Sequence, residues 1–465
     1  MMFSIRIFSS KNISQFLLCM ILGSSLILGG ASRYNEAVCL FLSFISILTL
    51  FFVLLDNRLP KSSLQSKLLI FMSCFLVFLL SLQTIPLPYK VWSTLPGRDI
   101  ILTGVDLLGL NSISLPLSLT PRETVSSLLF TLPVIAVFSL ISKMKVSCSS
   151  PVFVWTISTI AVFSVLLGII QIFSGKESFL YFHEITNKGF AIGFFANVNH
   201  QASFLVMSLP IFTVLAIKQH ERMIAHRSDI GQNVIVLLVG LLILIGIITA
   251  GSVAGYVLAI LSLSASLMIF LGQKRKMNPI YFVSAVCLIG FSLNSILTSP
   301  QLSGLGQTSF GDGVGSRPYL FDKTIRGIKD TFPVGTGLGS FEQIIPIYEN
   351  PYEVTSRYMN HSHNEYLEWT LETGILFPIF ITVFMGFFGA QLVSIWRAPA
   401  SHNGLRRAAS LVVFIPILHS LADYPLRTPA LAVFTAACIG LMFVNAENKK
   451  TSSREFSSPQ NHIEL

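Results

Sequence analysis

Long apolar blocks constrain this chain more than any other feature of its sequence. About twelve stretches carry almost no charge, and a bilayer crossing needs about 20 mostly apolar residues. They fall at 13–30, 38–55, 68–85, 124–142, 152–173, 194–217, 234–250, 253–271, 280–298, 373–395, 408–421 and 428–446. Only 11% of the residues are charged and the mean hydropathy is +0.71, whereas soluble domains carry about 25% charged residues. The pattern predicts an all-α polytopic membrane protein with about 12 transmembrane helices and one large outer loop containing short helices.

The distribution of charge indicates which loops lie inside. With the N-terminus inside, the inner segments hold 19 of the 31 basic residues and 6 of the 22 acidic ones. The inner face therefore sums to +13 and the outer face to −4, as the positive-inside rule requires, and together they give the formal charge of +9. The basic residues are scattered among loops and form no single patch, so they do not indicate nucleic-acid binding. Both termini are predicted to be cytoplasmic.

The six cysteines are dispersed, with no CxxC motif and no Cys/His cluster. Neither a structural zinc site nor a disulfide framework is therefore predicted. Two outer segments are too long to be simple connections, and long ordered loops are usually functional. We call 86–123 the first outer segment and 299–372 the second outer segment.

The middle of the second outer segment has two recognisable patterns. In LFDKTIRGIKD, one helical face carries Leu320, Phe321, Ile325 and Ile328, while Asp322, Lys323, Arg326 and Lys329 are predicted to face outward. The following PVGTGLGSF supplies Gly335, Gly337 and Gly339. Glycines at this spacing can aim backbone N–H groups at an anion. Outside a strand–helix context, the pattern favours a tight turn.

The second outer segment ends in RYMNHSHNEYLEWTLETG, where His361 and His363 precede a predicted helix. Glu365, Glu368 and Glu372 fall on one face of that helix. Three interpretations stay open: a solvated, capped helix start, a histidine general base at the membrane surface, or a metal site formed by the histidines and a carboxylate. The residues alone do not decide among them.

A second polar cluster, GFFANVNHQASF, lies at the predicted outer mouth of the sixth apolar block. It contains Asn197, Asn199, His200 and Gln201. Polar groups at such a position either bond to a neighbouring helix or line a cavity. Read alone, the cluster favours packing.

Together the two clusters resemble the bacterial O-antigen ligase and O-antigen polymerase family. The resemblance rests on an N-x-N-H-x-A-like motif followed by an outer loop reading R…G-x-G-x-G-x-F…H-x-H-N-x-Y-L-E, and it covers roughly residues 190–395. It implies a metal-independent, inverting glycosyltransferase of the GT-C type in the bacterial inner membrane. Such an enzyme transfers a glycan from an undecaprenyl-diphosphate carrier to a lipid A-core or growing polysaccharide acceptor on the periplasmic face, with no cofactor and no nucleic-acid partner.

The resemblance also implies roles for individual residues. His363 matches the general base and Arg317 matches the arginine that binds the diphosphate. His361, Asn364, Arg357, Arg326, Asn197 and Asn199 are the expected substrate-binding residues. One departure is the turn between the blocks 234–250 and 253–271, where many family members carry Ser-Arg and this chain has Ser252-Val253. The candidate replacements for that arginine are Lys188, Arg122 and Arg427.

The predicted organisation has five parts. Residues 1–123 hold the N-terminal transmembrane helices and first long periplasmic loop, 124–298 the central transmembrane helices, 299–372 the periplasmic catalytic loop, 373–446 the C-terminal transmembrane helices, and 447–465 a cytoplasmic tail. The rival functions are a transporter or flippase of lipid-linked oligosaccharide and a non-catalytic assembly protein. Ion-coupled transporters place carboxylates or broken helices at mid-membrane, and no predicted span here has a charge well inside it. Nothing in the sequence separates ligase from polymerase.

Overall fold

The structure is a computed structural model that describes residues 9–32, 35–110, 113–144, 146–227, 229–271, 316–352, 359–399 and 403–444. Within these residues, regular structure is helical apart from one short ladder. The strands β1 (Pro86–Leu87) and β2 (Leu115–Pro116) pair antiparallel, with Pro86 opposite Pro116. The all-α class predicted from the apolar blocks is therefore confirmed.

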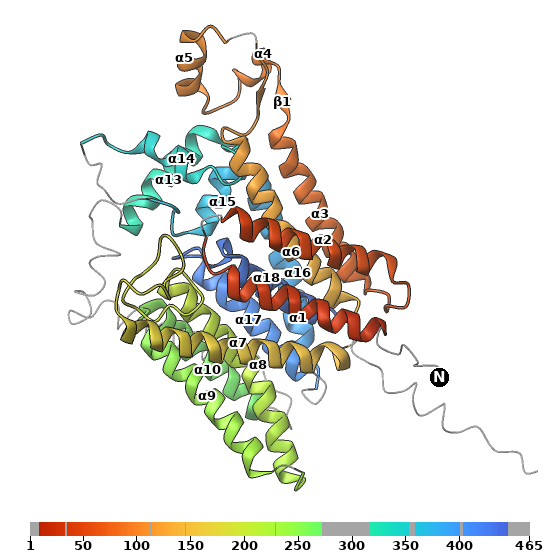
Figure 1. The fold of residues 1–465 in the computed structure, drawn as a ribbon. Coiled ribbons are helices and arrows are strands. Elements are labelled where there is room, and N and C mark those ends of the chain that lie inside the picture. The colour runs from red at the N-terminus through yellow and green to blue at the C-terminus, as the bar shows by residue number, and fades with distance from the viewer. Residues whose placement is uncertain are drawn as a thin grey trace, which may run out of the picture.

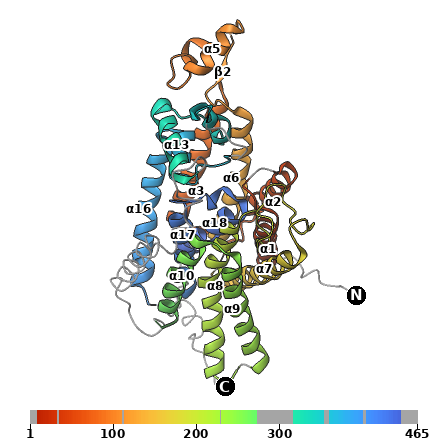
Figure 2. The same ribbon diagram turned by 90° about the vertical axis from the view of Figure 1, so that its left-hand side faces the viewer.

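Nine of the described helices are long and apolar enough to cross a membrane. They are α1 (Ser10–Leu28), α2 (Glu36–Leu55), α3 (Leu64–Ser81), α6 (Pro121–Ser142), α7 (Val146–Ser174), α8 (Val198–Ile224), α9 (Ile230–Ala250), α10 (Val253–Leu271) and α16 (Leu376–Arg397). They pack into one body, seen from two sides in Figures 1 and 2. The chain is a multi-pass membrane protein.

The predicted number of twelve crossings is not confirmed. The blocks 408–421 and 428–446 form α17 (Gly404–His419) and α18 (Pro429–Phe443), of only 16 and 15 residues. At 1.5 Å per residue these helices are shorter than the roughly 30 Å hydrocarbon core. Other helices bury both of them, so their length need not match the bilayer. The block 280–298 lies outside the described residues.

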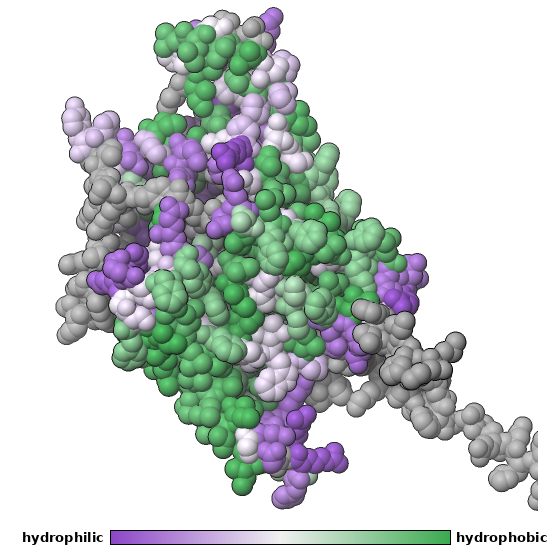
Figure 3. All heavy atoms as spheres, viewed as in Figure 1, coloured by the Kyte–Doolittle hydropathy of each residue, from purple (hydrophilic) through white to green (hydrophobic). Residues whose placement is uncertain are grey.

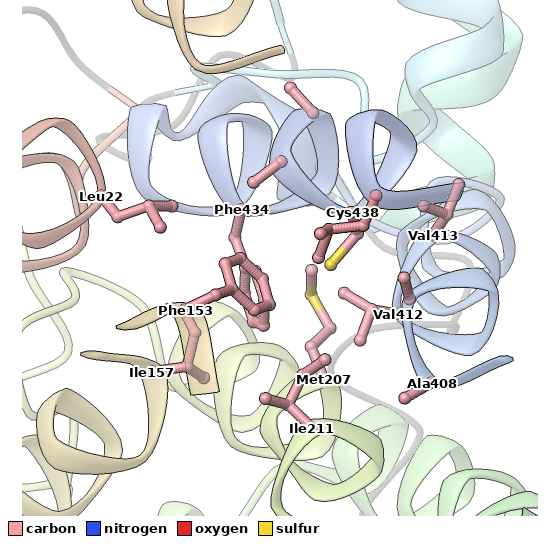
Figure 4. Close-up of a cluster of buried hydrophobic side chains, with 14 of the residues drawn as sticks. Leu22, Phe153, Ile157, Met207, Ile211, Ala408, Val412, Val413, Phe434 and Cys438 are labelled. Atoms are coloured by element: carbon pink, nitrogen blue, oxygen red, sulfur yellow. The ribbon is translucent and has the colours of Figure 1, made fainter. Parts of the chain in front are cut away.

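The core forms around α18, which packs against α6, α17 and α1. Phe434 of α18 lies 6.0 Å from the Phe153 ring and 6.1 Å from the Phe204 ring, measured between centroids, and Cys438 lies in the same cluster (Figure 4). Small residues along α18, such as Ala437, let neighbouring helices approach closely, as is typical of packing between membrane helices. The core thus holds the loop that precedes α18 in a fixed place.

The outer surface of α9 and α10 is apolar. Leu237 and Ile248 on α9 are 61% and 66% exposed, and Leu267 on α10 is 56% exposed. Figure 3 shows a largely hydrophobic surface over these helices, with hydrophilic residues gathered below the uppermost lobe and near the bottom of the view. A large exposed apolar surface of this kind is what lipid-facing helices present.

The two outer segments meet at one end of the molecule. The first follows η1 (Leu82–Thr84) and contributes α4 (Tyr89–Trp92) and α5 (Asp99–Leu107), which form a lobe with the β1–β2 ladder (Figure 1). The second contributes α13 (Arg317–Thr331), α14 (Phe341–Ile344), η3 (Ile345–Tyr348) and α15 (Glu365–Thr373). Arg98 is fully buried and joins the segments, because it donates to the carbonyls of Leu117 (2.6 Å) and Gly335 (3.2 Å).

Candidate active site

The carboxylate of Asp423 is the centre of a buried polar cluster. Asp423 lies in the loop between α17 and α18, just before η5 (Pro425–Arg427). Its Oδ1 is 3.4 Å from His363 Nδ1, and its Oδ2 is 3.4 Å from Arg317 Nη2. Asn199 at the start of α8 donates its side-chain N–H to Oδ2 at 2.7 Å. The structure therefore brings the predicted base and the predicted diphosphate-binding arginine to one carboxylate.

Two further histidines face the same carboxylate. The Nε2 atoms of His200 and His419 each lie 3.8 Å from an Asp423 oxygen, and both side chains are buried. His419 Nδ1 is 2.7 Å from the hydroxyl of Ser203. Burial acts to raise the pKa of Asp423, but the neighbouring His200 and His363 outweigh it and hold the pKa well below its ordinary range. Asp423 is therefore ionised although it is fully buried.

The backbone at His363 is unusual. Its φ is 56°, in the left-handed region that non-glycine residues seldom adopt. The next residue, Asn364, caps α15 by accepting the N–H of Leu367, and Ser362 exchanges two hydrogen bonds with the Asn364 backbone. The chain thus turns sharply immediately before the helix, and strained residues of this kind cluster at functional sites. The Asn cap agrees with the predicted helix start.

Arg317 is the first residue of α13. Ser316 caps this helix by accepting the N–H of Tyr319, and Pro318 occupies the first turn, where its missing N–H costs nothing. The Arg317 side chain is 13% exposed, so its guanidinium lies at the edge of the buried cluster. A helix start therefore aims this arginine at Asp423.

The predicted faces of α13 are partly wrong. Lys323 is buried at 8% exposure, whereas Ile325 is 39% exposed. The cause is the packing of α13 on α15, where Gly327 lies against Leu371 and the buried face is rotated from the one expected. The Lys323 ammonium lies 4.7 Å from the centroid of the Tyr319 ring. Tertiary packing thus overrides the simple amphipathic pattern.

A second imidazole–carboxylate pair lies beside the first. His361 Nδ1 is 2.7 Å from Glu368 Oε1, and Glu368 Oε2 accepts the backbone N–H of Ser362 at 2.8 Å. Arg427 lies 3.4 Å from Glu368 and donates to Glu372 at 2.8 Å. All of these side chains are buried or nearly so. The glutamates of α15 therefore form an internal network, and the interpretation of a solvated helix face is wrong.

Burial and Arg427 set the ionisation of this network. Burial raises the pKa of Glu365 to about 8, and its Oε1 accepts the Leu426 N–H at 2.6 Å. Burial also raises the pKa of Glu372. For Glu368 burial acts in the same direction, but the charge of Arg427 and the hydrogen bond with His361 outweigh it and lower its pKa. Glu368 is thus the carboxylate that stays ionised beside His361.

The ring of Tyr424 is the shared surface on which the histidines pack. Its centroid lies 4.2 Å from that of His361 and 4.9 Å from those of His363 and His200. Its hydroxyl accepts a hydrogen bond from the Asn360 side chain at 3.3 Å. One buried aromatic residue thus fixes the relative positions of both histidines of the H-S-H-N sequence.

The glycine-rich loop is a tight turn, as the sequence favoured. Gly335, Gly337 and Gly339 all have positive φ, between 80° and 110°. The Gly337 N–H donates to the Glu372 carbonyl at 2.9 Å, and the Leu338 N–H donates to Gln83 at 3.0 Å. These N–H groups bind protein acceptors, so they are not available for an anion. The loop instead packs the second outer segment on the first.

The remaining predicted residues are distributed as follows. Asn197 caps α8, Asn364 also donates to the Leu421 carbonyl at 3.1 Å, and the Arg326 side chain is 60% exposed and pairs with Asp322. Arg357 lies outside the described residues. Arg326 follows Arg317 by nine helical residues, which is roughly 13 Å along α13. Arg326 is therefore displaced along the helix from the Asp423 cluster.

The candidate replacements for the missing turn arginine have protein partners of their own. Arg122 pairs with Glu36 at 2.8 Å, Lys188 pairs with Glu177 at 3.3 Å, and Arg427 is bound by the α15 glutamates. The α9–α10 turn is nonetheless connected to the Asp423 cluster. Ser252 donates to Asn199 Oδ1 at 2.7 Å, and Asn199 in turn binds Asp423. A hydrogen-bonded chain thus connects the α9–α10 turn to the cluster.

Sequence reasoning missed Asp423. The residue lies in LADYPLRTP, the short connection between two apolar blocks, and it is the single acidic residue there. An acidic residue two positions beyond a predicted crossing is costly to bury unless it is paired, and that signal pointed to a functional role. Among the described residues, no three His, Cys, Asp or Glu side chains are arranged to hold a metal ion.

Helical architecture and a buried histidine–arginine–carboxylate cluster define a polytopic membrane protein with a candidate catalytic site at one end. Comparison with protein families then gives one match. A family model described as O-antigen ligase matches residues 238–381, which include Arg317, His361 and His363. This match supports the resemblance to the O-antigen ligase and polymerase family that the motifs predicted. A search of curated proteins gave no match. Asp423 lies beyond the matched segment.

Proposed function

We propose that this protein transfers a glycan from an undecaprenyl-diphosphate carrier to a saccharide acceptor, at the periplasmic face of the bacterial inner membrane. The acceptor is lipid A-core in a ligase or a growing polysaccharide in a polymerase. The observation that supports this most is the convergence of His363 and Arg317 on Asp423. The family match supports the glycosyl-transferring class. The predicted outer ends of α8, α10, α13 and α18 all meet at this cluster, which supports one outward-facing site.

In the proposed reaction, the acceptor hydroxyl attacks the anomeric carbon of the donor sugar. Its proton passes to His363 Nε2, because Nδ1 faces the carboxylate of Asp423. The bond between the anomeric carbon and the diphosphate oxygen breaks, and undecaprenyl diphosphate leaves with the electron pair. Attack opposite to departure inverts the anomeric configuration. Ionised Asp423 stabilises the imidazolium that forms, and a positioned general base contributes typically about 10²–10⁴-fold to the rate.

Arg317 is proposed to bind the departing diphosphate. A guanidinium presents a planar fork of donors that matches phosphate oxygens, and its charge offsets the negative charge that develops as the bond breaks. Its side chain is 13% exposed, so it is placed between the buried cluster and the outside. The remaining expected substrate contacts are His361, Asn364, Arg357, Asn197 and Asn199. Arg326 is not proposed as one, because it is displaced along α13 from the cluster. The proposed reaction proceeds without metal or nucleotide.

A transfer assay in detergent micelles tests this function. Carrier-linked glycan and acceptor are extracted from a strain that lacks the gene, mixed with the purified protein, and followed for transfer. Micelles contain no two compartments, so a flippase has nothing to transport and gives no product. We expect product with the wild type and none with Arg317→Ala. Transfer at the wild-type rate by the Arg317→Ala variant would overturn the role of this arginine.

The matched control is Arg326→Ala. Arg326 lies on the same helix and is exposed and paired with Asp322. We expect this variant to retain most of the transfer rate. In cells, Arg317→Ala should accumulate carrier-linked glycan and lack high-molecular-weight glycan at an unchanged protein level.

A further inference from the structure

We propose that His361 is the residue that positions the acceptor sugar, and that Glu368 and Arg427 hold it in the tautomer this task requires. The inference rests on the proposed function and deepens it. It assigns the second histidine of the H-S-H-N sequence a hydrogen bond from a hydroxyl of the acceptor, separate from the hydroxyl that His363 deprotonates.

The hydrogen bond to Glu368 fixes the proton on the His361 ring. An ionised carboxylate can only accept hydrogen bonds, so His361 Nδ1, at 2.7 Å from Glu368 Oε1, must be the nitrogen that carries hydrogen. In a neutral imidazole the other nitrogen then has a free lone pair. Nε2 is therefore an acceptor, and the natural donor for it in a glycan is a hydroxyl group.

Glu368 is itself held on three sides. Its second oxygen accepts the Ser362 N–H at 2.8 Å, and Arg427 lies 3.4 Å from the first. The guanidinium of Arg427 lies 4.9 Å from the centroid of the Trp369 ring and is anchored by Glu372. Neither Glu368 nor Arg427 has room to move, since their side chains are 1% and 11% exposed. The network has no reacting atom of its own, so its function is positioning.

His361 is reachable and correctly placed for this role. Its side chain keeps 14% exposure, whereas the carboxylate behind it is buried. His361 and His363 both pack on the Tyr424 ring, with centroids 4.2 and 4.9 Å away. The shared tyrosine fixes the spacing of the two imidazoles. In the proposed complex, one sugar residue of the acceptor contacts both histidines, with neighbouring hydroxyls at the two Nε2 atoms.

Two substitutions of His361 separate its two nitrogens. His361→Asn places an amide near Nδ1, which preserves the contact with Glu368 and removes Nε2. His361→Gln places an amide oxygen near Nε2 and restores an acceptor there. In the detergent assay with extracted carrier-linked glycan and acceptor, we expect His361→Asn to raise the KM for the acceptor roughly three- to tenfold, the value of one hydrogen bond. The KM for the donor should not change, and His361→Gln should recover part of the loss.

Glu368→Gln tests the tautomer. The amide can donate as well as accept, so Nδ1 is no longer forced to carry the hydrogen, and we expect the same selective rise in the KM for the acceptor. Glu221→Gln is the control, because Glu221 is exposed in the last turn of α8 and does not belong to the network around His361. It should leave both KM values within about twofold. Thermal unfolding of each variant reports the fold, and if His361→Asn is poorly folded, Glu368→Gln and His361→Gln decide the question.

The outcomes separate this inference from the proposed function. If the wild type transfers glycan but His361→Asn and Glu368→Gln leave both KM values unchanged, or raise them equally, the positioning role is wrong and the function stands. If the wild type transfers nothing from the carrier-linked donor, the proposed function fails first. A selective rise in the KM for the acceptor in both variants, with recovery in His361→Gln, supports the inference.

Discussion

The two imidazole–carboxylate pairs of this protein contact the same tyrosine, yet they are built differently. Asp423 has Arg317 and three histidines at 3.4–3.8 Å, and its one short side-chain bond is to Asn199 at 2.7 Å. Glu368 makes a short bond of 2.7 Å to His361 and accepts a backbone N–H. A loosely held imidazole can take up a proton and tighten its bond as charge develops, whereas a tightly held one keeps a fixed proton. The comparison fits the proposals of chemistry at the first pair and positioning at the second.

We call His363 and Asp423 the loose pair, and His361 and Glu368 the tight pair. The largest effect should come from removing the imidazole of the loose pair. His363→Ala deletes the proposed base while leaving Asp423 paired with Arg317, and we expect kcat to fall by about 10²–10⁴-fold. The detergent transfer assay measures it. His220→Ala is the control, since His220 is an exposed histidine that packs on Phe270. A His363→Ala variant that retains more than a tenth of the wild-type kcat would break the division of roles.

The next largest effect should be a loss of stability when the network around the tight pair is broken. Arg427→Met leaves Glu368 buried without its cation, and breaking a buried ion pair costs about 3–5 kcal/mol. We expect the free energy of unfolding in detergent to fall by that amount, with a lower midpoint in thermal unfolding. Arg326→Met, which breaks an exposed pair with Asp322, should change stability by less than about 1 kcal/mol. Equal losses in the two variants would argue against a rigid network around Glu368.

A smaller effect should follow from neutralising the loose carboxylate. Asp423→Asn keeps the shape of the side chain and removes the charge that stabilises the His363 imidazolium, so we expect kcat to fall by about 100-fold while the KM for the acceptor changes little. Glu368→Gln should instead raise the KM for the acceptor and change kcat little. If both variants change the same parameter, the two pairs do not have separate roles.

The smallest effect concerns pH. Burial raises the pKa of Glu365 to about 8 in the folded protein, above the ordinary value of about 4.3 in an unfolded chain. The folded state therefore binds the extra proton, so the stabilisation is complete below about pH 4 and is lost as the pH rises through 8. We expect the free energy of unfolding to fall by roughly 2 kcal/mol between pH 6 and pH 8 on account of Glu365 alone. Glu365→Gln should reduce this slope and leave only the part due to Glu372, whose pKa is also raised. An unchanged slope would contradict the assignment to Glu365.

Local patterns predicted much of the architecture. The apolar blocks gave the helical class, and nine described helices are of spanning length. The glycine triplet predicted the tight turn that the structure contains, and the sequence before α15 predicted the helix start that Asn364 caps. Each of these features depends on neighbours within a few residues or on one element. The faces of α13 were missed at Lys323 because that face is chosen by α15, which lies elsewhere in the chain.

In the candidate site, too, local motifs predicted some residues, while residues whose partners lie far apart in the chain were missed. The motifs singled out His363 and Arg317, and the structure places both at Asp423. They did not single out Asp423, and they did not show that Glu368 and Arg427 hold His361. A lone acidic residue in a short connection has no pattern of its own, and its partners come from α8, α13, α17 and the segment before α15.

The sequence by itself determined that this is a multi-pass membrane protein and which residue types gather at its outer loops. Transfer of apolar side chains out of water is roughly additive along a helix, so it can be read from composition and length. Only the tertiary structure decided which carboxylate lies beside which histidine. The reason is that a buried charge is stable only where partners from distant segments converge, and that convergence depends on how every helix packs.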